Sequence, residues 1–87
     1  MSDKKEVLFL REEYGEGRGK YTYPNGEKYV GMWKNHLWDG QGRFNLYDGN
    51  KVVGEFKKGR PWNTKLYDKN WKYLTKFVNG VLQELSP

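Results

Sequence analysis

The chain has 87 residues and a formal net charge of +5, and 17% of its residues are aromatic. This length fits one domain with a thin core, so a two-domain enzyme with a deep catalytic cleft is excluded. The absence of cysteine removes disulfides, thiolate metal ligands and cysteine nucleophiles. Alanine, the best helix former, is also absent, so we expect an all-β protein with an aromatic core.

The longest apolar run, Val7–Leu10, is too short for a signal peptide or a membrane-spanning helix. We therefore expect a cytoplasmic protein. The positive charge lies mainly in the second half, because residues 45–87 hold 8 basic and 4 acidic residues.

Glycines and aromatic residues alternate along much of the chain, as in Tyr29, Gly31 and Trp33. A period of two is typical of a β-strand with one face buried. Tight hairpin turns are expected at 24–26, 48–50 and 68–70, where Asn, Asp and Gly gather. The predicted strands lie near residues 5–10, 18–23, 28–34, 41–46, 51–57, 64–67, 71–77 and 81–85.

A repeat becomes visible when the chain is shifted by 23 residues. Gly17 then falls on Gly40, Gly31 on Gly54, and Trp33 on Phe56. A third, weaker copy follows. A glycine inside a strand leaves a bare patch of backbone that a neighbouring ring can cover. We expect rings to lie over Gly31, Gly40 and Gly42, with charged residues on the opposite face of the sheet.

Two segments, 29–35 (Tyr-Val-Gly-Met-Trp-Lys-Asn) and 40–44 (Gly-Gln-Gly-Arg-Phe), resemble the MORN (membrane occupation and recognition nexus) repeat, and so does the stretch from Gly54 to Gly59. The resemblance implies an elongated, twisted antiparallel sheet of successive β-hairpins, with about three copies that degenerate at both ends. We predict a single domain over 1–87. Its copies would lie near 6–28, 29–51 and 52–72, followed by capping strands at 73–85.

Several positions depart from the repeat pattern. His36 stands where a turn glycine is usual, and the end copies lack several glycines. Altered end repeats often serve as caps. Glu6–Leu10 and Val81–Leu85 are thus predicted edge strands. Because an apolar edge invites pairing with another chain, we predict a homodimer through these strands.

No motif in the sequence supports catalysis or a cofactor. The Gly-x-Gly segments at 15–19 and 40–42 lack the helix and the Gly-Lys-Ser/Thr of a phosphate loop. His36, the one histidine, is interpreted as a turn residue, and Asp48-Gly49-Asn50 as a hairpin turn rather than a calcium loop. The carboxylates at 12, 13 and 16 are interpreted as solvated. We therefore predict a non-enzymatic protein that needs no metal or cofactor.

The leading hypothesis is a scaffold module that binds a protein partner through its concave face of aromatic residues and glycines, or through an edge strand. The candidate partner surface consists of Tyr29, Trp33, Trp38, Phe44, Phe56 and Trp62.

An alternative is binding to anionic phospholipid headgroups, a role long proposed for MORN proteins. Each basic residue near a membrane contributes about 1 kcal/mol. The competing interpretation of these charges is a solvated face that resists aggregation and binds nothing. The candidate lipid surface consists of Lys57, Lys58, Arg60, Lys65, Lys69, Lys72 and Lys76. Nucleic-acid binding, which would need exposed rings among Trp62, Tyr67, Trp71 and Tyr73, ranks below both.

Overall fold

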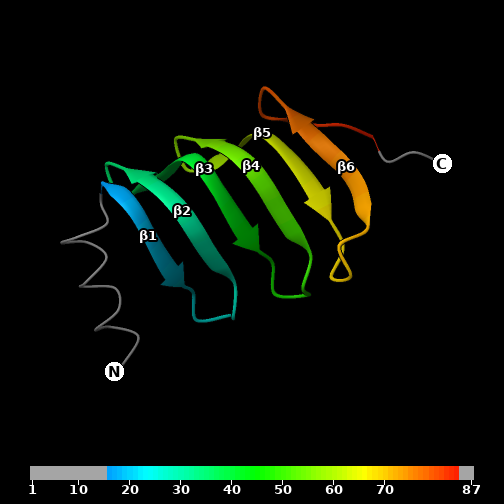
Figure 1. Ribbon diagram of the computed structural model, residues 1–87, viewed down its shortest axis with the longest axis horizontal. Helices are drawn as coiled ribbons and strands as arrows, with labels where there is room; N and C mark the ends of the chain where they lie inside the picture. Colours follow the sequence, from blue (N-terminus) through cyan, green and yellow to red (C-terminus); the bar gives the residue numbers. More distant parts are fainter. Residues whose placement is uncertain (1–15, 85–87) are drawn as a thin grey trace.

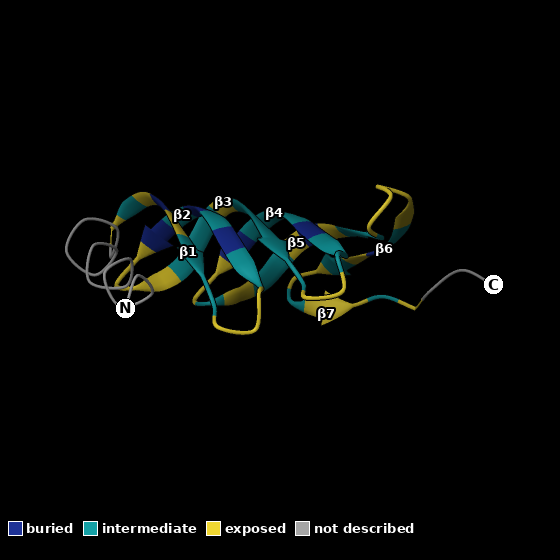
Figure 2. Ribbon diagram, turned by 90° about the horizontal axis from the view of Figure 1, so that it is seen from below, coloured by how far each residue is buried: buried dark blue, intermediate teal, exposed yellow. Residues whose placement is uncertain are grey.

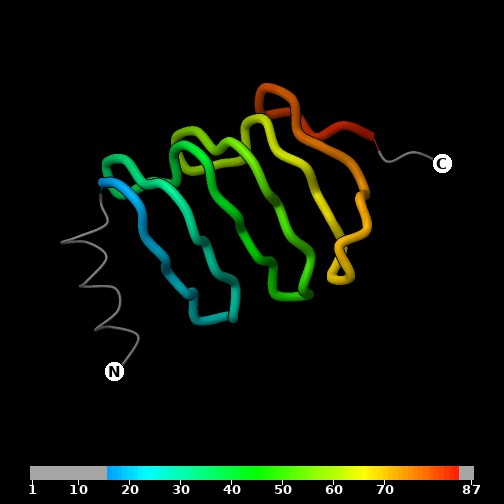
Figure 3. Tube along the Cα trace, viewed as in Figure 1, coloured from blue at the N-terminus to red at the C-terminus, as the bar shows by residue number. Residues whose placement is uncertain are grey.

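The computed structural model describes residues 16–84, which form one antiparallel sheet (Figure 1). The predicted strand at 5–10 and the acidic residues at 12 and 13 lie outside this range. The order of the strands in the sheet is their order in the chain, so each strand pairs with its sequence neighbours (Figure 3). The strands are β1 (Gly17–Thr22), β2 (Lys28–Lys34), β3 (Leu37–Asn45), β4 (Lys51–Lys57), β5 (Arg60–Tyr67), β6 (Tyr73–Val78) and β7 (Val81–Leu82).

The described part of the chain contains no helix, and the sheet forms a single layer (Figures 1 and 2). The molecule measures 44 × 24 × 14 Å. This architecture confirms the predicted all-β array of successive hairpins. No second layer of secondary structure covers either face of residues 16–84.

Three turns at one edge of the sheet join β1 to β2, β3 to β4, and β5 to β6. In each turn a backbone N–H donates back across the loop, as from Leu46 to the Asn50 carbonyl at 2.8 Å. An Asn or Asp side chain then accepts from a backbone N–H two residues on, as Asp48 does from Asn50 at 2.9 Å. These are the turns that the sequence predicts at 24–26, 48–50 and 68–70.

Turns at the opposite edge are two residues long. The central residues Asn35 and His36 have φ angles of 52° and 66°, and Lys58 and Gly59 have 51° and 85°. Two successive positive φ angles are the mark of a type I′ turn, which matches the twist of the flanking strands. His36 is therefore a turn residue, as predicted.

These tight turns explain where the strand predictions were too short. We expected β3 to begin at residue 41 and β5 at residue 64. They begin at Leu37 and Arg60, because strand pairing resumes directly after each type I′ turn. The β7 strand covers Val81 and Leu82, the first two residues of the predicted strand at 81–85.

The register defines two faces of the sheet, because residues directly opposite each other in adjacent strands point to the same side. We call the side that carries Tyr29 the aromatic face. A line of paired backbone positions crosses this face from β1 to β5, and we call it the glycine line. It consists of Gly19, Gly31, Gly42, Gly54 and Thr64. The opposite side, which carries Lys20 and Arg43, is called the basic face.

Candidate functional site

The core of the aromatic face is a stack of rings above the glycine line. Tyr29 has no exposed surface, and its ring lies over Gly31 and Gly42. Trp38 stacks on Tyr29 with ring centroids 4.9 Å apart and planes 7° from parallel. Trp33 and Phe56 meet the Tyr29 ring edge-on, at 5.2 and 5.1 Å. The rings therefore act as the second layer that the sheet otherwise lacks.

Burial has a chemical consequence at Tyr29. Its hydroxyl donates a hydrogen bond to the Met32 carbonyl at 3.0 Å. Burial of the phenol disfavours the phenolate and raises the pKa of Tyr29 to about 12. Tyr29 is thus a neutral core residue at physiological pH.

One expected ring contact is absent. We expected Gly40, like Gly31 and Gly42, to lie under a ring, but a Cβ added there would meet Met32 Cβ at 3.0 Å. The cause is an irregularity between β2 and β3, where the pairing shifts between Gly31 and Trp33. Gly40 adopts a φ of 107° at this irregularity.

The structure divides the six residues of the predicted partner surface into two groups. Tyr29, Trp33 and Phe56 are buried, so they hold the fold together and offer little surface to a partner. Trp38, Phe44 and Trp62 are partly exposed. Trp38 and Phe44 pack against the buried core, whereas Trp62 packs beside Gly80 with the Lys57 ammonium 4.7 Å from its ring centroid.

Trp38 and Phe44 belong to a larger set of partly exposed apolar side chains that widens the aromatic face. They pack against the core on four strands and the β3–β4 turn, and nothing in residues 16–84 covers them as a layer. They are Tyr21, Trp38, Phe44, Leu46, Leu66 and Phe77. Sequence reasoning missed Tyr21, Leu46, Leu66 and Phe77 because it considered mainly Trp and the strongest repeat positions.

All seven residues of the predicted lipid surface are exposed, but they lie in three places. Lys57, Lys58 and Arg60 surround the β4–β5 turn at one edge of the sheet. At the opposite edge, Lys69 and Lys72 belong to the β5–β6 turn. Between the edges, Lys65 and Lys76 face each other directly across β5 and β6 on the basic face.

A small aromatic group accompanies the lysines of the β5–β6 turn. Trp71 and Tyr73 are each 50% exposed. Tyr67 lies between them, 5.4 Å from the Trp71 ring and 6.1 Å from the Tyr73 ring. The Lys51 ammonium sits 4.8 Å from the Trp71 ring centroid and donates to the Gly49 carbonyl at 2.9 Å. These contacts tie two neighbouring turns together.

A further repeating feature, which the sequence did not reveal, links each repeat to the next. At each type I′ turn, the first residue donates its backbone N–H to a side-chain oxygen of the preceding repeat. We call these three hydrogen bonds the turn latches. They join Asn35 to Glu16 at 2.8 Å, Lys58 to Asp39 at 3.1 Å, and Asn79 to Asn63 at 2.9 Å.

The described residues show no arrangement that suggests catalysis. Residues 16–84 hold no group of three or more His, Cys, Asp or Glu side chains that could bind a metal ion. Among the same residues there is no helix that could cross a membrane. What the surface offers is instead an open apolar face and a separate basic face, both suited to binding.

Comparison with known families agrees with this geometry. The model of the MORN repeat matches residues 16–28 and 29–51. The second match contains Tyr29, Trp33 and Trp38 of the ring stack, together with Gly31 and Gly42 beneath Tyr29, whereas Phe56 lies beyond it. No curated protein matches the chain. MORN repeats generally occur in binding and scaffold proteins. Residues 16–51 therefore consist of MORN repeats, as their glycine and aromatic spacing predicts.

Proposed function

We propose that this protein is a non-enzymatic scaffold module that holds a protein partner against its aromatic face. The observation that carries the proposal is the continuous band of partly exposed apolar side chains on a sheet with no second layer. Exposed apolar surface of this kind on a soluble protein commonly marks an interaction site. The buried rings beneath it provide a rigid base, which lowers the entropic cost of binding.

Two adjacent residues allow a direct test, because they point to opposite faces of β6. Phe77 lies on the aromatic face opposite Thr64, and Lys76 lies on the basic face opposite Lys65. A photo-crosslinking amino acid is placed at position 77 in one variant and at position 76 in another. Both are expressed in cells, and the crosslinked products are identified. We expect position 77 to capture a distinct protein, and position 76 reports what binds the opposite face.

A matched substitution then tests the captured protein. Trp62 is partly exposed and stands apart from the core cluster, so Trp62→Ala should weaken binding while the fold survives. Trp38 is unsuitable for this purpose because it stacks on Tyr29. Lack of capture at position 77, or full binding of the captured protein by the Trp62 variant, would contradict the proposal.

A second candidate function is peripheral binding to anionic phospholipids. The full exposure of all seven basic residues favours it, as do the half-exposed Trp71 and Tyr73 rings beside Lys72. Tryptophan and tyrosine are the residues enriched at the membrane–water interface. Flotation with phosphatidylserine vesicles at low and high salt tests this candidate. Lys57→Glu, Lys58→Glu and Arg60→Glu together should abolish flotation, and unchanged flotation would argue against it.

A further inference from the structure

A row of side chains crosses the basic face at right angles to the strands. The register places Lys20, Val30, Arg43, Val53, Lys65 and Lys76 at successive positions on β1 to β6. We call its four charged members, Lys20, Arg43, Lys65 and Lys76, the cation row. No acidic residue interrupts this row within the described strands.

The carboxylates that might have neutralised the row serve elsewhere. Glu16 and Asp39 accept backbone N–H groups in the turn latches, and Asp48 and Asp68 accept backbone N–H groups within their own turns. On the basic face, Glu55 accepts a hydrogen bond from Asn63 Nδ2 at 3.4 Å. Four of these five carboxylates therefore bind backbone N–H groups at the edges of the sheet, and Glu55 lies on the basic face beside the row.

Two features of the cation row are unfavourable in the isolated protein. Lys65 and Lys76 stand directly opposite each other, and like charges in that position repel. Arg43 Nε is buried and has no hydrogen-bond partner among the described residues. Leaving a buried donor unsatisfied is costly.

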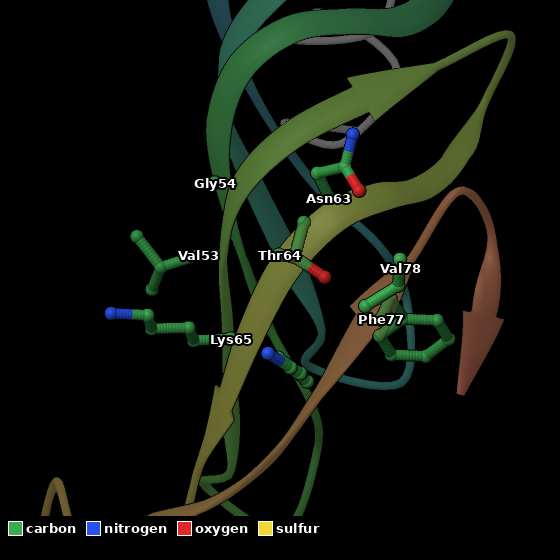
Figure 4. Close-up of a pocket in the computed structure, with 8 residues that line it drawn as sticks. Val53, Gly54, Asn63, Thr64, Lys65, Phe77 and Val78 are labelled. Carbon is green, nitrogen blue, oxygen red and sulfur yellow. The ribbon is translucent and has the colours of Figure 1, made fainter. Parts of the chain in front are cut away.

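A hollow of about 340 Å³ lies at the end of the row where the two lysines meet. It is lined from β4, β5 and β6, and Figure 4 shows the Val53 and Lys65 side chains extending to the same side of the sheet. Gly54, Asn63, Thr64, Phe77 and Val78 complete its lining, so the hollow also reaches residues of the aromatic face. The hollow therefore offers apolar contact next to positive charge.

We infer that the cation row docks an extended acidic segment of a protein partner, whose carboxylates lie against the cations while an apolar side chain enters the hollow. The inference rests on the proposed function in assuming a protein partner, but it uses the opposite face. It adds that this partner carries an extended acidic segment.

The spacing of the row suits an extended peptide that crosses the strands. Adjacent strands lie about 4.8 Å apart, so Lys20, Arg43 and Lys65, each two strands from the next, are spaced by about 10 Å. A polyproline II segment has three residues per turn and advances about 9 Å per turn. Acidic residues at every third position would then face successive cations.

The twist of the sheet favours a peptide over a membrane for this surface. Adjacent strands rotate by about 20–25°, so the surface direction turns by roughly a right angle between β1 and β5. A flat bilayer cannot meet Lys20 and Lys65 together, whereas a flexible peptide can follow the turn.

The test uses the full chain and a fluorescein-labelled peptide of four Glu-Pro-Pro repeats, with the corresponding Gln-Pro-Pro peptide as its uncharged control. Binding is followed by fluorescence anisotropy at low and high salt. Lys65→Gln with Lys76→Gln removes half of the row, and Lys57→Gln with Lys58→Gln removes the same charge at a turn edge. Thermal melting checks that both variants fold.

We expect the acidic peptide to bind, the uncharged peptide not to bind, and salt to weaken the affinity. The row variant should bind about tenfold more weakly, and the turn variant within about twofold of the original chain. Lack of binding at low salt, or equal losses in both variants, would overturn the inference.

Two further arms test other anionic ligands. Phosphatidylserine vesicles and oligothymidylate are compared in place of the peptide. If either ligand depends on Lys65 and Lys76 while the acidic peptide does not bind, the inference is overturned in favour of that ligand. The peptide test reports on the cation row and does not use the band of apolar side chains on the aromatic face, so its failure leaves the proposed function standing.

Discussion

The ring of Tyr29 lies so close above Gly42 that a methyl group added to the glycine would come within 2.5 Å of the tyrosine Cζ atom. Gly42 does not have a positive φ, so its backbone conformation is open to any residue. Its small size is what the position requires. The glycine line and the ring stack are therefore two halves of one packing arrangement.

Gly42→Ala tests this relationship. The added methyl group must displace the Tyr29 ring from Trp38, Trp33 and Phe56, so we expect a loss of about 1–3 kcal/mol in the free energy of unfolding. Urea denaturation measures the change. In a Tyr29→Val background the ring is gone, and the same glycine substitution should cost much less. Equal costs in both backgrounds would show that the ring is not the obstacle.

The turn latch between Asp39 and Lys58 is a second target. Asp39→Ala removes the acceptor for the Lys58 backbone N–H, which now receives a hydrogen bond of 3.1 Å. We expect a loss of about 1 kcal/mol in unfolding free energy and faster hydrogen exchange at the Lys58 amide. Asp39→Asn is the control, because Asn63 performs the same task in the next repeat. It should stay close to the original stability.

Lys65 opposite Lys76 predicts a stabilising substitution. Lys65→Glu replaces repulsion across β5 and β6 with attraction, and should raise the unfolding free energy by about 0.2–1 kcal/mol. Thermal and urea unfolding at low salt measure the gain, which high salt should reduce. If the variant were less stable than the original chain, the two side chains could not be facing each other as described.

Tyr29 predicts how stability depends on alkaline pH. Its pKa of about 12 in the folded protein lies above the ordinary value of 10.0, because burial disfavours the phenolate. Between these pH values the folded chain keeps a proton that the unfolded chain has lost. The stabilisation is thus fully present below pH 10 and is lost as the pH rises toward 12, with a slope of up to about 1.4 kcal/mol per pH unit.

Unfolding in urea across this pH range, together with the ultraviolet absorbance of tyrosinate, measures the effect. The Tyr29→Phe variant serves as the control. It lacks the titrating group and should show a shallower decline, with a modest constant loss from the missing hydrogen bond to Met32. The same slope in both proteins would assign the decline to other groups.

The sequence predicted the strands β2 and β4 with their observed bounds, because Tyr29, Gly31 and Trp33 alternate there without interruption. It placed the start of β3 too late because the Asn35-His36 turn contains no glycine and was not recognised as a two-residue hairpin turn. The division into copies and the homodimer through the edge strands stay predictions.

The site was harder to predict than the fold. Glycine and aromatic spacing shows which residues share a face, but it does not show which ring lies beneath another. Tyr29 and Phe56 were therefore assigned to the partner surface although they are buried beneath or beside Trp38. The turn latches join residues 16 to 19 positions apart and use three different side chains, so no local motif reveals them.

The agreement between strand order and chain order has a consequence for how the protein folds. Most all-β proteins fold slowly because strands distant in sequence must find one another. Here each hydrogen-bonded pair of strands is closed by one short turn, so any hairpin can form first and the sheet can grow from it in both directions. We expect folding within milliseconds, with rates set by turn formation. A chain lengthened by another complete copy would gain surface without rearranging the strands already in place.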